Sequence, residues 1–185
     1  MPTSNQPDQR ERDTNSMTIS KATQTDTKNL AALAVQVWLN TYAVEGIRQT
    51  FSNYIWEELT PTRFADKLKD PTREIYKVEV DMHLIGFAEI NYNSVSAIDP
   101  GLTVEIDKLY IQERFCGKHI GRQLLDHVVS ILKSKAIDHM WLSVYELNER
   151  AISFYKKYGF EYAGDIFFEL EEDRHRNLVM KKTII

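Results

Sequence analysis

The sequence predicts an α/β fold, with a mixed, twisted sheet and helices on both of its faces. Two stretches carry this prediction. Residues 103–111 read as an apolar strand that runs through a glycine turn into an amphipathic helix and then into the apolar stretch 140–145, an order typical of a parallel pair with a helical crossover. Residues 74–80 and 84–92, joined by a turn near Asp81, instead predict an antiparallel hairpin.

The N-terminal part of the expected domain is mostly helical. A short strand at 18–23 precedes a helix over 28–42, whose apolar residues recur at helical spacing and for which Asp26 is the expected N-cap. An aromatic-rich helical stretch follows, and Pro61 begins another short helix. We expect most aromatic side chains of this part to lie in the core and one or two to line a site: Trp38, Tyr42, Phe51, Tyr54 and Trp56.

The strand at 103–111 changes phase along its length. Its apolar residues occupy even positions up to Ile106 and odd positions from Leu109 onward, which places them on opposite faces of a regular strand. One extra residue near 107–108 would return them to one face, so we expect a β-bulge there. A strand buried on both faces is the alternative. A bulge would turn backbone N–H groups out of the ladder, where they could meet a ligand carbonyl.

The turn after this strand is basic and contains glycine. Gly117 permits close approach of the backbone, and Gly121 would let the following helix, at 120–135, pack tightly. Lys118 and Arg122 add positive charge beside the free N–H groups and the positive dipole end of that helix. This combination favours an anion-binding loop over a plain connection.

The C-terminal part completes the sheet. The stretch 140–145 is typical of a buried parallel strand. A helix is expected from Asn148 to Gly159, a typical C-terminal cap. Two strands, 160–170 and 177–182, follow with a charged turn between them. The expected order is therefore β, α, α, β, β, β, α, β, α, β, β.

Composition narrows the class of protein. The chain has 185 residues, enough for one domain, which we place at 17–185; the polar residues 1–16 predict a disordered extension. A net charge of −4 argues against a nucleic-acid binder, and the single cysteine, Cys116, argues against disulfides and a cysteine-rich metal site. No apolar run approaches the roughly 18 residues of a membrane span. We therefore expect a cytoplasmic protein with no metal, nucleic acid or membrane partner.

Two motifs resemble the GNAT superfamily of N-acetyltransferases. The acetyl-CoA signature Arg/Gln-x-x-Gly-x-Gly/Ala matches at Arg114 and Gly117 and departs at His119, where the family usually has Gly or Ala; the helix glycine Gly121 follows two residues after His119. The second signature is complete, and its residues are Asn148, Ala151, Phe154, Tyr155, Gly159 and Phe160. The resemblance spans residues 17–183. Within the superfamily, the chain is similar to bacterial PaiA-type polyamine acetyltransferases.

This resemblance implies a GNAT acyl-CoA N-acyltransferase fold and direct transfer of an acetyl group from acetyl-CoA to an amine. It implies that the N–H of Leu109 binds the thioester carbonyl, that the N–H of Ile111 holds the pantetheine arm, and that Tyr155 protonates the departing thiolate. Asn148 would bind pantetheine, cap its helix, or do both. The implied acetyl-CoA site comprises Leu109, Tyr110, Ile111, Arg114, Gly117, Lys118, His119, Ile120, Gly121, Arg122, Asn148 and Tyr155.

The general base is left open between two carboxylates. Glu105 aligns with the glutamate of histone-type members, and Asp107 aligns with the acid of polyamine-type members. Either could instead be a solvated strand residue, with water relaying the proton or with Glu89 or Glu146 in that role. His119 is expected to point outward; the alternatives are a hydrogen bond to a phosphate and weaker CoA binding.

The resemblance leaves the acceptor open. A small-molecule primary amine or a polyamine is the leading expectation. A protein α-amine or lysine acceptor, and a non-catalytic module that binds CoA, are the alternatives; a homodimer is also compatible with the resemblance. The acidic cluster at 169–173 could attract a cationic acceptor or could be a solvated hairpin turn.

Overall fold

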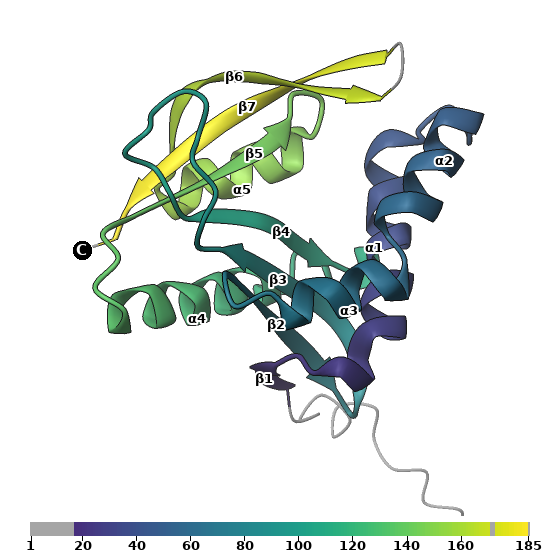
Figure 1. Cartoon of the computed structure of the whole chain (residues 1–185), viewed down its shortest axis with the longest axis horizontal. Coiled ribbons are helices and arrows are strands. Elements are labelled where there is room, and N and C mark those ends of the chain that lie inside the picture. Colours follow the sequence, from purple (N-terminus) through teal and green to yellow (C-terminus); the bar gives the residue numbers. More distant parts are fainter. Residues whose placement is uncertain (1–16, 171–172, 185) are drawn as a thin grey trace, which may run out of the picture.

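A computed structural model describes residues 17–170 and 173–184 of the chain. Its strands form one seven-stranded sheet in the order β1-β2-β3-β4-β5-β7-β6 (Figure 1). Neighbouring strands are antiparallel except for β4 and β5, which are parallel, so the predicted mixed sheet is confirmed. The strands are β1 (Met17–Lys21), β2 (Arg73–Val80), β3 (His83–Asn91), β4 (Glu105–Ile111), β5 (His139–Tyr145), β6 (Glu161–Leu170) and β7 (Asp173–Thr183).

Helices cover both faces of the sheet, as predicted. Apolar residues of the first three helices pack with Ile75 and Phe87 on one face. The other two helices pack with Ile106 and Met140 on the opposite face. The α-helices are α1 (Thr27–Tyr42), α2 (Gln49–Glu58), α3 (Pro61–Lys69), α4 (Ile120–Ser134) and α5 (Glu149–Tyr158), with short 3-10 turns at Gln24–Asp26 and Glu113–Phe115.

The helix ends confirm two of the predicted helix caps and contradict a third. Asn148 caps α5 through its side chain, and Gly159 ends that helix with a φ of 96°, both as predicted. Asp26, however, makes no side-chain cap to α1. Its carboxylate instead accepts a hydrogen bond from the backbone N–H of Thr23 at 2.7 Å and pairs with Lys77 at 2.8 Å. The available ion pair on β2 outcompetes the capping role.

The predicted bulge is present in β4. In the ladder with β3, Ile106 and Lys108 pair with consecutive residues, which leaves Asp107 as the extra residue. Leu109 and Ile111 consequently pack against the same core as Ile106. The phase change in the sequence therefore reflects a bulge. Part of the alternative also holds, because Lys108 is buried and Tyr110 packs against the core on the other face.

The parallel strands β4 and β5 are joined by a single residue pair. That pair is Glu105 and Trp141, and the N–H of Trp141 donates to the carbonyl of Val104 at 3.0 Å. Beyond it the strands diverge: Figure 1 shows β5, β7 and β6 turned away from β2, β3 and β4. The parallel arrangement was predicted, whereas the opening between the two strands was not.

One expectation about the end of an element needs correction, and another concerns residues outside the described part of the chain. β7 begins at Asp173, so residues 173–176 belong to the strand and not to the turn. The expected disordered segment 1–16 and residues 171–172 lie outside the described part of the chain. Within 17–170 and 173–184, no helix is long and apolar enough to cross a membrane. The same residues contain no group of acidic, histidine or cysteine side chains suited to holding a metal ion.

Candidate active site

A cavity of about 740 Å³ occupies the opening between β4 and β5. Its lining residues form two groups. One group comes from β4, the turn after it, the start of α4 and α5, and the other comes from α1, α2, β5, β6 and β7. The predicted site residues that line the cavity are Asp107, Leu109, Tyr110, Ile111, Gly117, His119, Gly121, Arg122, Asn148 and Tyr155.

Four predicted residues lie elsewhere. Arg114 and Lys118 line a separate hollow of about 390 Å³, and Phe115 lines both this hollow and the main cavity. Ile120 is buried in the core beneath α4. Glu105 stands at the closed end of the strand opening, where it pairs with Trp141, and does not line the cavity.

The turn after β4 is shaped by two residues with positive φ. Gly117 has a φ of 79°, and a Cβ built at this position meets no atom within 4 Å, so the backbone faces open space. His119 has a φ of 61° in the left-handed region and is exposed at the N-terminus of α4. A side chain in that region is strained by roughly 1 kcal/mol. The glycine that the family usually has at this position would carry no such strain.

Gly121 does not have the role expected from the sequence. A Cβ at this position would lie 3.7 Å from side-chain atoms of Ile111 and Phe154, which is an ordinary van der Waals distance. Tight packing of α4 therefore does not require glycine here, and the prediction about packing was wrong. Gly121 nevertheless lines the cavity.

The edge of β4 offers two free backbone donors to the cavity. The N–H of Gln112 donates to the carbonyl of Ile85 on β3 at 2.8 Å. Successive N–H groups of a strand point to opposite sides, so those of Ile111 and Leu109 point away from β3, toward the opening. Because β5 pairs with β4 only at Glu105, no described strand uses these two donors.

Tyr155 lies on the inner side of α5 with its ring in the core. It is 8% exposed, and its ring contacts Phe154 and Phe160 with centroids 5.3 and 5.5 Å away. Burial raises the pKa of its phenol well above the ordinary value. Among the described residues, none hydrogen-bonds the Tyr155 hydroxyl, which is free to meet a ligand in the cavity. The phenol therefore stays protonated at neutral pH.

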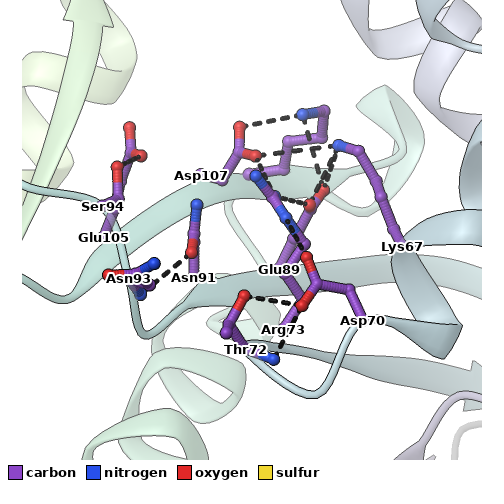
Figure 2. A network of polar contacts seen from close by, with 11 residues as sticks. Lys67, Asp70, Thr72, Arg73, Glu89, Asn91, Asn93, Ser94, Glu105 and Asp107 are labelled. Atoms are coloured by element: carbon purple, nitrogen blue, oxygen red, sulfur yellow. Dashed lines mark hydrogen bonds and ion pairs between the residues drawn. The ribbon is translucent and has the colours of Figure 1, made fainter.

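Asp107 belongs to a cluster of ion-paired side chains, called the charge cluster here, that also includes Lys67, Arg73, Glu89 and Lys108. Figure 2 shows Lys67, Arg73 and Glu89 around Asp107. Its carboxylate contacts Arg73 at 2.8 Å and Lys108 at 2.9 Å, and Lys67 donates to Glu89 at 2.9 Å. Arg73 also bonds Glu89. Glu89 is fully buried, so its charge depends on these three cations.

The charge cluster fixes the ionisation of Asp107. Burial by itself would raise the pKa of this carboxyl, but the positive charges of Lys108 and Lys67 and the hydrogen bonds from Lys108 and Arg73 outweigh burial and hold the pKa well below its usual value. Asp107 is therefore anionic at neutral pH. It is also a weak proton acceptor, because three cations already share its charge.

Glu105 has the opposite character. Figure 2 shows it apart from the charge cluster, with its carboxylate directed to Ser94. The Ser94 hydroxyl donates to it at 2.6 Å, and burial raises its pKa above the ordinary value for a glutamate. The two candidate bases thus have complementary properties. Glu105 has the raised pKa of a stronger base, whereas Asp107 lines the cavity.

Aromatic rings enclose the end of the cavity that faces α1 and α2. Tyr42 stacks on Tyr145 of β5 with centroids 4.9 Å apart, and Trp38 stacks on Tyr54 at 5.0 Å. Phe168 of β6 contacts the edge of Tyr54 at 5.4 Å. These five residues line the cavity. Of the other aromatic residues considered from the sequence, Phe51 is core and Trp56 is 77% exposed.

Some lining residues were not foreseen. Arg150, which pairs with Glu113 in the turn, lies at the α5 side, and Asn177 and Tyr145 lie at the aromatic end. Arg150 follows the capping Asn148 by two residues, a spacing that could have been read from the sequence. Asn177 carries no such signal, because it begins a run that reads only as a closing strand.

The parallel strands open around one cavity that both the glycine turn and the buried Tyr155 line, an arrangement that fits an N-acetyltransferase of the GNAT class and that comparisons with known proteins test. The fold is similar to the crystal structure of PaiA N-acetyltransferase from Thermoplasma acidophilum in complex with coenzyme A, with a TM-score of 0.72 and 24% identity, covering 91% of this chain and 99% of that one. The sequence matches the Acetyltransferase (GNAT) family over residues 27–160, and the chain belongs to this family. It is an acetyl-CoA-dependent N-acetyltransferase, and the GNAT fold expected from the motifs is confirmed.

Sequence relatives span different parts of the chain. An uncharacterized N-acetyltransferase of Mycobacterium tuberculosis (strain ATCC 25618 / H37Rv) is 27% identical over 161 residues, covering 87% of this chain and 99% of that protein. The spermine/spermidine N(1)-acetyltransferase of Bacillus subtilis (strain 168) is 34% identical over 73 residues, which are 37% of this chain and 46% of that enzyme. The full-length relative thus has no stated acceptor, and the relative with a stated acceptor matches only in part.

Proposed function

We propose that the protein transfers the acetyl group of acetyl-CoA to a primary amine of a small alkyl amine or polyamine. The observation that carries this proposal is the cavity between β4 and β5. One end of it has free backbone N–H groups and a glycine turn suited to acetyl-CoA, and aromatic rings enclose the other end. An amine held among the rings would face a thioester held along β4. Both reactants would then occupy the cavity together, as direct transfer requires.

The residues along β4 and the turn fit acetyl-CoA. The N–H groups of Leu109 and Ile111 are free donors on the open edge of the strand, suited to the thioester carbonyl and the pantetheine amide. The turn at Gly117 and the N-terminus of α4 suit the pyrophosphate, because the backbone at Gly117 faces open space and the first N–H groups of a helix have no partner within the helix. Arg122 and Arg150 add positive charge at the same end.

Three groups of this chain would assist the transfer. The N–H of Leu109 would stabilise the carbonyl oxygen as the amine nitrogen attacks the carbonyl carbon and negative charge develops there. The phenol of Tyr155 would donate its proton to the sulfur as the carbon–sulfur bond breaks. A carboxylate would take the proton that the amine loses, since a free alkyl ammonium has a pKa near 10.

We propose that Glu105 takes this last proton through water and that Asp107 orients the amine. Burial raises the pKa of Glu105 above the ordinary value for a glutamate, which makes it a stronger base than Asp107, but Glu105 lies outside the cavity wall and needs a relay. Asp107 lines the cavity, yet its depressed pKa makes it a poor base. A pH profile separates the two assignments. Glu105→Gln should remove the acid limb of kcat/KM that the raised pKa of Glu105 produces, whereas Asp107→Asn should lower activity without moving that limb.

The acceptor is inferred from the aromatic end. Stacked tyrosine and tryptophan rings bind an alkyl chain by apolar contact and an ammonium by cation–π attraction. The partial match to a spermine/spermidine N(1)-acetyltransferase supports the same class of acceptor.

A screen of amines tests the proposal. Purified protein is mixed with acetyl-CoA and each of a set of alkyl monoamines, diamines, polyamines, amino acids and lysine peptides, and free thiol is followed over time. We expect thiol release with alkyl amines and polyamines that depends on both substrates. Release only with peptides would assign the enzyme to protein substrates. The absence of release with every amine would contradict the proposed function.

A further inference from the structure

Asn177 is a buried polar residue in the cavity wall, and its side-chain oxygen has no hydrogen-bond partner among the described residues. It lies on β7, is 7% exposed and lines the cavity. The unpartnered oxygen, Oδ1, is itself buried. Buried amide oxygens are nearly always paired in folded proteins, and leaving one unpaired costs on the order of 1–3 kcal/mol.

The surroundings of Asn177 explain why a ligand, and not another side chain, would satisfy this oxygen. Asn177 pairs directly with Tyr145 across β5 and β7, so the two side chains stand side by side on one face of the sheet. The hydroxyl of Tyr42 also interacts with the Asn177 side chain. Because Oδ1 has no partner, this interaction engages the amide nitrogen.

A second unpartnered polar atom lies close by. His175 shares this face of β7, and its ring contacts Tyr42 and Tyr145 with centroids 5.8 and 5.5 Å away. Its Nε2 is likewise buried without a partner among the described residues. The aromatic end therefore has two unpartnered polar atoms, defined here as the polar patch. Asn177 Oδ1 belongs to a residue of the cavity wall, whereas His175 does not line the cavity and its ring contacts the lining rings of Tyr42 and Tyr145.

We infer that this polar patch recognises a second hydrogen-bond donor on the acceptor, beyond the amine that is acetylated. The inference rests on the proposed function, because it takes the aromatic end as the acceptor site. The ligand class is a primary amine whose alkyl chain ends in an ammonium or hydroxyl group that donates to Asn177 Oδ1. The tyrosine rings favour an ammonium, since their faces attract cations.

The charges around the cavity indicate that attraction to a carboxylate is not what would hold a second ammonium. Asp107 is the one carboxylate among the lining residues, and Lys67, Arg73 and Lys108 already share its charge. A second ammonium would therefore be held by a neutral amide and aromatic rings. The preference for an acceptor with a second donor group would therefore depend on Asn177 and change little with ionic strength.

The test compares acceptors that differ only in the second group. For chain lengths of three to six carbons, kcat/KM is measured with the α,ω-diamine, the amino alcohol and the n-alkyl monoamine, using wild type, Asn177→Leu and Asn177→Asp. We expect wild type to favour a diamine or amino alcohol over the matched monoamine by roughly ten- to a hundredfold, the scale of one hydrogen bond to a charged group. The ratio should fall toward one in Asn177→Leu. Asn177→Asp, which keeps an acceptor oxygen and adds charge, should retain or raise the diamine preference.

Thr50→Val is the matched control. Thr50 Oγ1 is also buried without a partner among the described residues, but Thr50 does not line the cavity. This variant should keep the wild-type ratio. An unchanged ratio in Asn177→Leu, or no preference in wild type at any chain length, would overturn the inference.

A binding measurement separates this inference from the proposed function. Each amine is titrated calorimetrically into the protein saturated with CoA, in wild type and in the Asn177 variants. If binding of the diamine depends on Asn177 but no amine is acetylated, the polar patch stands and the proposed function fails. If monoamines and diamines are acetylated equally and bind equally, the proposed function stands and the polar patch has no role in recognition.

Discussion

Replacing Tyr155 by phenylalanine tests the assignment on which the chemistry depends most. The change removes one oxygen and keeps the ring between Phe154 and Phe160. The hydroxyl has no hydrogen-bond partner among the described residues, so its loss breaks no internal hydrogen bond and should not lower the free energy of unfolding. Affinity for acetyl-CoA should also change little.

The effect on turnover should be large. If the phenol protonates the departing thiolate, its loss should lower kcat by about 100-fold or more, which corresponds to roughly 2.7 kcal/mol of transition-state stabilisation. Both kcat and kcat/KM should fall together, because the interaction is made only in the transition state. Burial raises the Tyr155 pKa above its ordinary value, so wild-type kcat should not decline through loss of this proton below about pH 10.

Thiol-release kinetics and a melting curve on the same preparation provide the measurement. Tyr162→Phe is a suitable control, because Tyr162 is 55% exposed and does not line the cavity. Normal turnover in Tyr155→Phe would refute the role of general acid. A destabilised protein with normal turnover in its folded fraction would show that Tyr155 is only a core aromatic residue.

Three further predictions concern the turn and the charge cluster. Gly117→Val should abolish the rise in melting temperature that acetyl-CoA causes in wild type, because a side chain would enter the open space at φ 79°; an equal rise in both proteins would exclude this turn from the binding site. His119→Gly should stabilise the fold by up to about 1 kcal/mol and leave acetyl-CoA affinity unchanged or tighter, because it removes a left-handed side chain; a tenfold loss of affinity by calorimetry would show that the imidazole contacts a phosphate. Because the folded-state pKa of Asp107 is depressed, its stabilising contribution is complete above the unfolded-state pKa of about 3.9 and is lost as pH falls below it. Urea unfolding between pH 3 and 7 should therefore show a shallower acid decline for Asp107→Asn, together with about 1–3 kcal/mol lower stability at pH 7; parallel curves would mean that the carboxylate is not held by its neighbours.

The sequence predicted those parts of the fold and site that depend on local pattern. The bulge in β4 followed from the shift of apolar residues between Ile106 and Leu109, because strict alternation cannot bring both side chains to one face without an extra residue between them. The capping of α5 by Asn148 and its end at Gly159 followed from residue type and spacing. Family signatures placed the expected acetyl-CoA site on β4, the turn after it and α5, and residues of all three line the cavity.

Features that depend on distant contacts could not be predicted in the same way. The charge cluster joins Lys67 of α3 to residues of β2, β3 and β4, and nothing in the sequence pairs them. Phe51 and Tyr54 lie three residues apart on α2, yet one is core and the other lines the cavity. Gly121 was assigned a packing role that the actual distance to Phe154 does not support.

The single residue pair that joins β4 and β5, Glu105 and Trp141, also has a consequence for folding. The strands on one side of it come from residues 17–111, and those on the other side come from residues 139–183, so each half of the sheet is continuous in sequence. Such contiguous units commonly open and close cooperatively, each with its own free energy. We expect the C-terminal half to detach at lower cost than global unfolding, since few hydrogen bonds hold it to β4. A ligand lying across both halves would then tie two folding units together, and amide hydrogen exchange in β5 would slow when it binds.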